Sequence, residues 1–171
     1  MHIRRHHLIE EAKAELDVTY EEVKRAENQL IALDLEYGEK ISEVRRANGT
    51  RMPEKVEKLV AERESRKIHV DVASLYRLEK AALERFSILT AAFSSVCVHA
   101  EDEHAIEKIG YYVFRPKEFD TLPPHVKQAV GDFVQGLRAY TTEAASSDND
   151  RMVREAWGVI EDTLRGFGRT I

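Results

Sequence analysis

The fold is decided by residues 9–44, which read IEEAKAELDVTYEEVKRAENQLIALDLEYGEKISEV. An apolar residue recurs at every seventh position, in a first set made up of Ile9, Leu16, Val23, Leu30, Tyr37 and Val44. A second set follows three residues after the first and consists of Ala12, Thr19, Ala26 and Leu33, with Ile41 close to it. Glu, Lys and Arg fill most of the other positions. This repeat predicts one long coiled-coil helix over about residues 4–47, and with it an all-α fold.

The end of this helix is marked by residues 47–53, which read ANGTRMP. Asn48 and Gly49 suit a left-handed C-cap, and Pro53 suits the first turn of a following helix. We therefore predict a second helix from Pro53 to about Ile109. Residues 61–67, AERESRK, have almost no apolar face, so the second helix is expected to be weak or kinked there.

The short loop between the two helices predicts that they run antiparallel. If the turn centres near residue 50, facing residues have numbers that sum to about 100, so that apolar residues meet. Val44 then faces Val56, Ile41 faces Leu59, and Leu33 faces Ile68. We predict a long antiparallel helical hairpin over residues 1–109, with its turn near residues 48–53.

The C-terminal third, residues 110–171, begins with GYYVFRP at residues 110–116, which breaks the helical pattern. We predict an extended connector there, whose Tyr111, Tyr112 and Phe114 either pack on the hairpin base or offer an edge to a partner. Two shorter helices follow, one opening at Pro123 and Pro124 and one after the polar residues 146–150. We expect both to pack at the base of the hairpin, as one domain with it.

The predicted hairpin has more apolar residues than two helices can cover. Its core is too thin to bury Leu35, Tyr37, Phe86 and Phe93 together. The remaining surface needs a cover, which is the C-terminal segment, a second copy of the chain or another protein. A protein partner or a homodimer is therefore expected.

Composition excludes several classes of protein. Of the 171 residues, 26 are Lys or Arg and 31 are Asp or Glu, a net charge of −5 that is unlike a nucleic-acid-binding polycation. The lone Cys97 permits no intrachain disulfide, and Glu10 and Glu11 stand where a signal peptide needs an apolar stretch. The longest uncharged run has 15 residues, Phe86–Ala100, fewer than the roughly 20 that span a bilayer. We expect a soluble, cytoplasmic protein without a membrane partner.

Catalytic motifs are missing from the sequence. It has no phosphate-binding GxxxxGK[ST], no GxGxxG, no HExxH, no GxSxG and no CxxC. Cys97 and His99 are two residues apart, so they point in different directions on a helix, and Cys97 is expected to be a buried structural thiol. We predict no enzymatic activity and no cofactor.

One cluster has the composition of a metal site. Residues 99–104 read HAEDEH, which places His99 and Glu103 one helical turn apart and His104 beside them. The hairpin would bring His2, His6 and His7 near, so His99, Glu103 and His104 are candidate metal ligands. Attraction between Arg4, Arg5 and residues 101–103 is an alternative, and plain solvation is another.

The hairpin tip is the basic part of the chain. Residues 45–58 contain five basic and two acidic side chains, and the candidate partner-binding residues there are Arg45, Arg46, Asn48, Arg51, Lys55 and Lys58. Such a tip can contact a phosphate backbone or an acidic protein surface. No aromatic residue is present to stack on a base. Cations near a helix C-terminus also stabilise the helix dipole without any partner.

These features favour a non-enzymatic helical protein-interaction module, such as an adaptor, an inhibitor or an assembly factor, that binds a partner or itself through its apolar helical stripe. A nucleic-acid-contacting protein that uses the basic tip is the alternative. A helical metal-binding protein is a third possibility.

Overall fold

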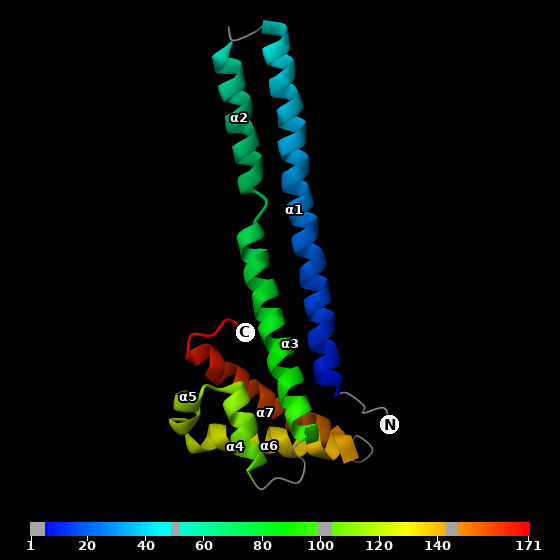
Figure 1. Cartoon of the computed structure of the whole chain (residues 1–171), viewed down its shortest axis with the longest axis vertical. Helices are drawn as coiled ribbons and strands as arrows, with labels where there is room; N and C mark the ends of the chain where they lie inside the picture. Colours follow the sequence, from blue (N-terminus) through cyan, green and yellow to red (C-terminus); the bar gives the residue numbers. More distant parts are fainter. Residues whose placement is uncertain (1–5, 49–51, 99–103, 143–146) are drawn as a thin grey trace. The chain divides into compact units, whose positions relative to one another are not determined.

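The computed structural model describes residues 6–48, 52–98, 104–142 and 147–171, and they form an all-α protein (Figure 1). The described residues contain no strand. The helices are α1 (His7–Asn48), α2 (Pro53–Ile68), α3 (Val72–Val98), α4 (Ala105–Val113), α5 (Pro116–Asp120), α6 (Pro124–Thr142) and α7 (Ser147–Gly166). The predicted fold class is confirmed.

The chain divides into two compact units, which we call the hairpin unit and the bundle unit. The hairpin unit is Asp17–Glu79, and the bundle unit joins Met1–Leu16 to Lys80–Ile171. Residues 80–109, predicted as part of the hairpin, lie in the same unit as the C-terminal helices. Each unit is described separately below.

The hairpin unit consists of α1 running antiparallel to α2 and the start of α3 (Figure 1). Ion pairs and hydrogen bonds fix the register: Arg66 pairs with Glu36 at 3.2 Å, Lys67 with Asp34 at 3.0 Å, and Tyr76 donates to Glu27. Each of these pairs of numbers sums to within three of 100, as predicted. The repeated apolar residues of α1 are buried or half-buried throughout the unit.

Helix α1 ends at Asn48 and α2 begins at Pro53, on either side of the predicted turn, whose residues 49–51 lie outside the described residues. The second helix, however, is not continuous to Ile109. It breaks at residues 69–71, beyond the predicted weak stretch 61–67, and α3 ends at Val98. Residues 61–67 stay helical because Arg66 and Lys67 are held by carboxylates of α1.

The extended connector predicted at residues 110–116 is wrong. Tyr111 and Tyr112 lie in helix α4, and only Phe114 and Arg115 have extended backbone, between α4 and α5. The reason is burial, since Ile109 and Val113 of α4 are fully enclosed and a helix places both on one side. Packing therefore overrides the local strand propensity of the aromatic run.

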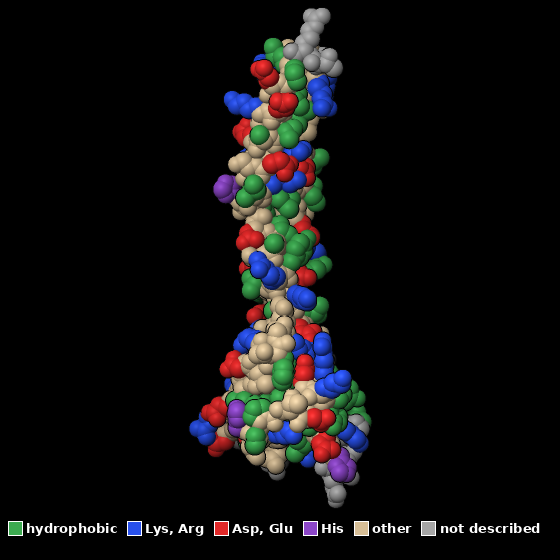
Figure 2. Space-filling model, turned by 90° about the vertical axis from the view of Figure 1, so that its left-hand side faces the viewer, with side chains coloured by type: hydrophobic (Ala, Val, Ile, Leu, Met, Phe, Trp, Pro, Cys, Tyr) green, Lys and Arg blue, Asp and Glu red, His purple; other side chains and the backbone are tan. Residues whose placement is uncertain are grey.

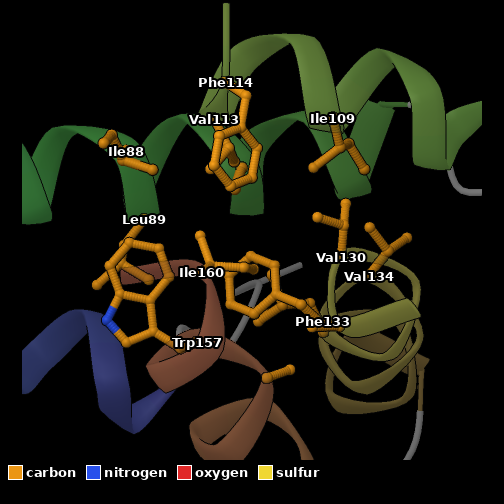
Figure 3. Close-up of a cluster of buried hydrophobic side chains, with 14 of the residues drawn as sticks. Ile88, Leu89, Ile109, Val113, Phe114, Val130, Phe133, Val134, Trp157 and Ile160 are labelled. Carbon is orange, nitrogen blue, oxygen red and sulfur yellow. The ribbon is translucent and has the colours of Figure 1, made fainter. Parts of the chain in front are cut away.

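The core of the bundle unit lies where α3, α4, α6 and α7 meet (Figure 3). Phe133 of α6 and Trp157 of α7 lie with their ring centroids 5.8 Å apart, and Leu89 of α3 packs in the same cluster. Helix α6 buries Val126, Val130 and Leu137 beside Phe133, and α7 buries Val153, Ile160 and Leu164 beside Trp157; Met152 of α7 is half-buried, and Phe167, just after α7, is exposed.

One stretch of the chain, Pro53–Val98, is long enough and apolar enough by composition to cross a membrane. The core helix of a soluble protein meets the same criterion. Ile88, Leu89 and Phe93 of α3 belong to the bundle core, whereas Leu78, Leu83 and Val98 of the same helix are exposed.

Candidate interaction surface

The thin core of the hairpin unit buries Tyr37 with the help of charged side chains. The Lys40 ammonium lies 4.6 Å from the centre of the Tyr37 ring, and the Arg66 guanidinium lies 5.7 Å from it. Glu36 binds both cations, at 2.6 Å and 3.2 Å, and its hydrogen bond with Lys40 lowers the pKa of its carboxyl group. The predicted surplus of apolar surface therefore does not include Tyr37.

The large apolar residues of α1 that are exposed in the hairpin unit include Val18, Tyr20, Ile31 and Leu35. Of these, Leu35 and Ile31 are a pair four residues apart. Their side chains are 65% and 57% exposed. Figure 2 shows the α2 side of the hairpin unit, where hydrophobic side chains reach the surface between charged ones. Leu35 and Ile31 lie one turn apart on a different side, the side of α1 opposite its buried repeat. We call this side the outer face of α1, and its residues are Glu21, Lys24, Asn28, Ile31, Leu35, Gly38, Ser42 and Arg45.

The outer face follows the same seven-residue repeat as the buried seam. Its members recur at intervals of three and four residues, so they stay on one side of α1 over six turns. All are exposed except Gly38, which is half-buried and whose position has no neighbouring atom within 4 Å of an added Cβ. No feature within the hairpin unit therefore requires glycine there.

The break between α2 and α3 adds further apolar surface. Asp71 begins α3 as its cap, accepting hydrogen bonds from the Ser74 backbone N–H at 3.0 Å and from its hydroxyl at 2.6 Å, and both bonds lower the pKa of Asp71. Ile68, just before the break, is 79% exposed. It borders a shallow hollow lined also by Leu30, Val70 and Val72.

The basic residues predicted at the tip lie in the last turns of α1 and the first turns of α2. Arg45, Arg46, Lys55 and Lys58 are all exposed. The Asn48 amide instead donates to the Val44 carbonyl at 3.3 Å and serves the end of α1. Arg51 lies outside the described residues.

The aromatic candidates of α4 separate into two kinds. Phe114 is 1% exposed and packs edge-on against Phe167, so it is a core residue and cannot serve as a docking side chain in this structure. Tyr111 and Tyr112 are exposed, and Tyr111 packs edge-on against Phe119. Asp120 raises the pKa of the Tyr111 hydroxyl.

The candidate metal ligands are only partly described. His99 and Glu103 lie outside the described residues, and His104 is exposed at the start of α4, 3.9 Å from the Glu107 carboxylate. Among described side chains, no three His, Cys, Asp or Glu gather at one point. Cys97 is half-buried against the bundle core, and burial raises the pKa of its thiol.

His6 is a buried histidine that the sequence analysis grouped with the histidines near residue 100. Among the described residues, its contacts are with α1, α6 and α7: Nδ1 accepts a hydrogen bond from the Leu8 N–H at 3.0 Å, Nε2 lies 3.3 Å from Asp150, and the ring is edge-on to Tyr140. Burial lowers the pKa of His6, and Asp150 opposes this shift in part. The neutral imidazole therefore caps the start of α1.

Arg154 extends this network within the bundle unit. It binds Asp150 at 2.9 Å and holds both carboxylate oxygens of Glu11, at 2.7 and 2.8 Å. These bonds lower the pKa of both carboxyl groups and raise that of Arg154. The ion pairs of this network hold the start of α1 against α7.

Leu35 was predicted to need cover, whereas Ile31 and Gly38 were not among the predicted site residues. The available signal was an apolar residue at repeat positions that a two-helix hairpin normally leaves polar. Comparison with known proteins adds no constraint: no family model matches the chain, and no curated protein or solved structure is similar to it.

Proposed function

We propose that the protein is a non-enzymatic interaction module that binds a helix of a protein partner on the outer face of α1. The observation that carries this proposal is the exposure of Ile31 and Leu35, which lie one turn apart on the side of α1 opposite its buried repeat. Burying an Ile or Leu side chain is worth about 1.5–3 kcal/mol, so two adjacent ones supply a docking centre. Charged residues around them supply orientation rather than affinity.

Helix docking is the form of binding that this surface favours. The outer face is a straight row of side chains at helical spacing, without a deep pocket of the kind that encloses a small molecule. A helix of a partner can place its own side chains between those of the row. An adaptor, an inhibitor or an assembly factor would use such a face in the same way.

A photo-cross-linking amino acid at position 35 tests this proposal. In cells that make the protein, the variant with p-benzoylphenylalanine in place of Leu35 should form a discrete protein adduct upon irradiation. The matched control carries the same group in place of Glu57, an exposed residue of α2 in the same unit. Equal labelling at the two positions, or none at either, would contradict the proposal.

Nucleic-acid binding by the tip is the second proposal. Its support is that Arg45, Arg46, Lys55 and Lys58 are all exposed on neighbouring ends of α1 and α2. Reversing Lys55 and Lys58 to Glu should abolish retention on nucleic acid and leave docking on the outer face intact. Unchanged retention on nucleic acid would eliminate the proposal that the tip binds nucleic acid. We propose a cytoplasmic location for either function.

A further inference from the structure

We infer that a second copy of this chain docks on the outer face, with the two α1 helices antiparallel about a two-fold axis near residue 33. This dimer rests on the proposed function and specifies its partner. A two-fold interface requires a patch that is complementary to itself. The outer face meets that requirement in one register, in which the numbers of facing residues sum to 66.

The centre of this register is apolar. Ile31 of one copy faces Leu35 of the second copy, and symmetry repeats the contact, so the four most exposed large apolar side chains of the two outer faces cover one another. Both residues are more than half exposed in the single chain. A shift by one heptad in either direction would place Ile31 or Leu35 opposite polar side chains.

The next pair on either side combines a long polar residue with the smallest one. Asn28 of one copy faces Gly38 of the second copy. Gly38 stands in the middle of α1, where glycine weakens a helix, and an added Cβ would meet nothing within 4 Å. A partner helix explains why glycine occupies this position, because the missing side chain lets the Asn28 amide approach the backbone.

The ends of the register are complementary in charge. Glu21 of one copy faces Arg45 of the second copy, and all four of these side chains are exposed. Lys24 faces the small Ser42, so no like charges meet along the row. A parallel pair would instead set Glu21 against Glu21 and Arg45 against Arg45. Charge therefore selects the antiparallel arrangement and a second copy over an unrelated apolar helix.

The contact row is long but holds few large apolar side chains. Glu21 and Arg45 are 24 residues apart, about 36 Å along a helix. Because only four large apolar side chains lie at its centre, we expect a reversible dimer with a dissociation constant on the order of 10–100 μM.

Charge exchange in the full-length chain tests the register. Sedimentation equilibrium should show that Glu21→Arg alone, and Arg45→Glu alone, each raise the dissociation constant about tenfold. The double exchange should return it to within about threefold of the wild-type value, because both pairs are restored in reverse. Glu57→Arg on α2 makes the same change of charge away from the face and should have no effect.

Cysteine pairing tests the direction. In a Cys97→Ser background, Asn28→Cys and Gly38→Cys chains of different mass should form a mixed disulfide upon mild oxidation only when combined. Cross-linking of Asn28→Cys with itself would show a parallel pair and overturn the inference. So would a wild-type chain that stays monomeric at about 200 μM, or single reversals without effect.

The outcome also separates this dimer from the proposed function. A monomeric chain whose position 35 cross-links to a different protein would remove the dimer and leave the interaction module standing. A monomeric chain that forms no adduct at position 35 would remove both.

Discussion

Replacing Gly38 by alanine should stabilise the single chain and weaken its dimer. Gly38 is in the interior of α1, and a Cβ at this position would meet no atom within 4 Å. Alanine is favoured over glycine in a helix interior by about 1 kcal/mol, and it also lowers the entropy of the unfolded chain. With no clash to offset this gain, the free energy of unfolding should rise by about 0.5–1 kcal/mol.

The same methyl group has the opposite effect on association. In the proposed dimer the added methyl group points at Asn28 of the second copy, where the missing side chain of Gly38 lets the Asn28 amide approach the backbone. Overpacking of a fitted contact costs about 1–3 kcal/mol, so the dissociation constant should rise about fivefold or more. A single substitution therefore moves stability and association in opposite directions.

Two other glycines provide matched controls in the bundle unit. Gly158 of α7 also has open space around an added Cβ, so Gly158→Ala should give a similar gain in stability without changing the dimer. At Gly110 of α4 the added Cβ would lie 2.2 Å from the Phe119 ring, which is itself buried. Gly110→Ala should therefore destabilise the protein by about 1 kcal/mol or more, despite its better helix propensity.

Urea denaturation followed by far-UV circular dichroism at low micromolar concentration measures the stability of the single chain, and sedimentation equilibrium measures the dimer. The reasoning is refuted if Gly38→Ala destabilises the chain as Gly110→Ala does, because the space around Gly38 would then be occupied. An unchanged dissociation constant for Gly38→Ala would refute the expected weakening of the dimer.

Three further predictions concern the bundle unit. Because burial lowers the pKa of His6, the free energy of unfolding should be at its full value above the ordinary histidine pKa of about 6.5 and should decline as the pH falls below it. His6→Gln should make the free energy of unfolding nearly independent of pH between about pH 7 and pH 5.5. An unchanged pH dependence in this variant would count against capping of α1 by His6. Phe133→Ala should cost about 3–5 kcal/mol in urea denaturation, whereas a loss below 1 kcal/mol would contradict the core. Arg154→Met should lower the free energy of unfolding by about 0.5–1 kcal/mol, since the ion pairs of Arg154 are partly exposed. The variant should also speed hydrogen exchange at the start of α1. Unchanged exchange would argue against a contact of Arg154 that holds α1 against α7.

The sequence was sufficient to predict the hairpin of α1 and α2 because its signals are local and repeated. The seven-residue spacing from Ile9 to Val44 identifies the buried side of α1, and Asn48 and Pro53 mark where the chain turns. The antiparallel register then follows from loop length alone. The ion pair of Lys67 with Asp34 agrees with it.

Other features depend on contacts between distant residues and could not be predicted in this way. The aromatic run at residues 111–114 favours a strand by itself, but burial of Ile109 and Val113 makes most of it helical. The break of the second helix lies at Asp71, whose carboxylate captures the Ser74 N–H, and not in the charged stretch before it. Charge-rich segments are good helix formers when partners hold their side chains.

The candidate site was predictable in part. The surplus of apolar surface in the hairpin was expected, and Leu35 was among the residues named, but Tyr37 proved to be covered by Lys40 and Arg66. Which apolar residues remain exposed depends on the paths of neighbouring side chains. A periodic pattern alone does not reveal those paths.

Sedimentation equilibrium of the wild-type chain beside the Glu21→Arg, Arg45→Glu and doubly exchanged variants tests the central claim most directly. We predict a wild-type dimer, about tenfold weaker association for each single reversal, and recovery in the double exchange. A wild-type monomer, or single and double variants that all associate alike, would contradict it.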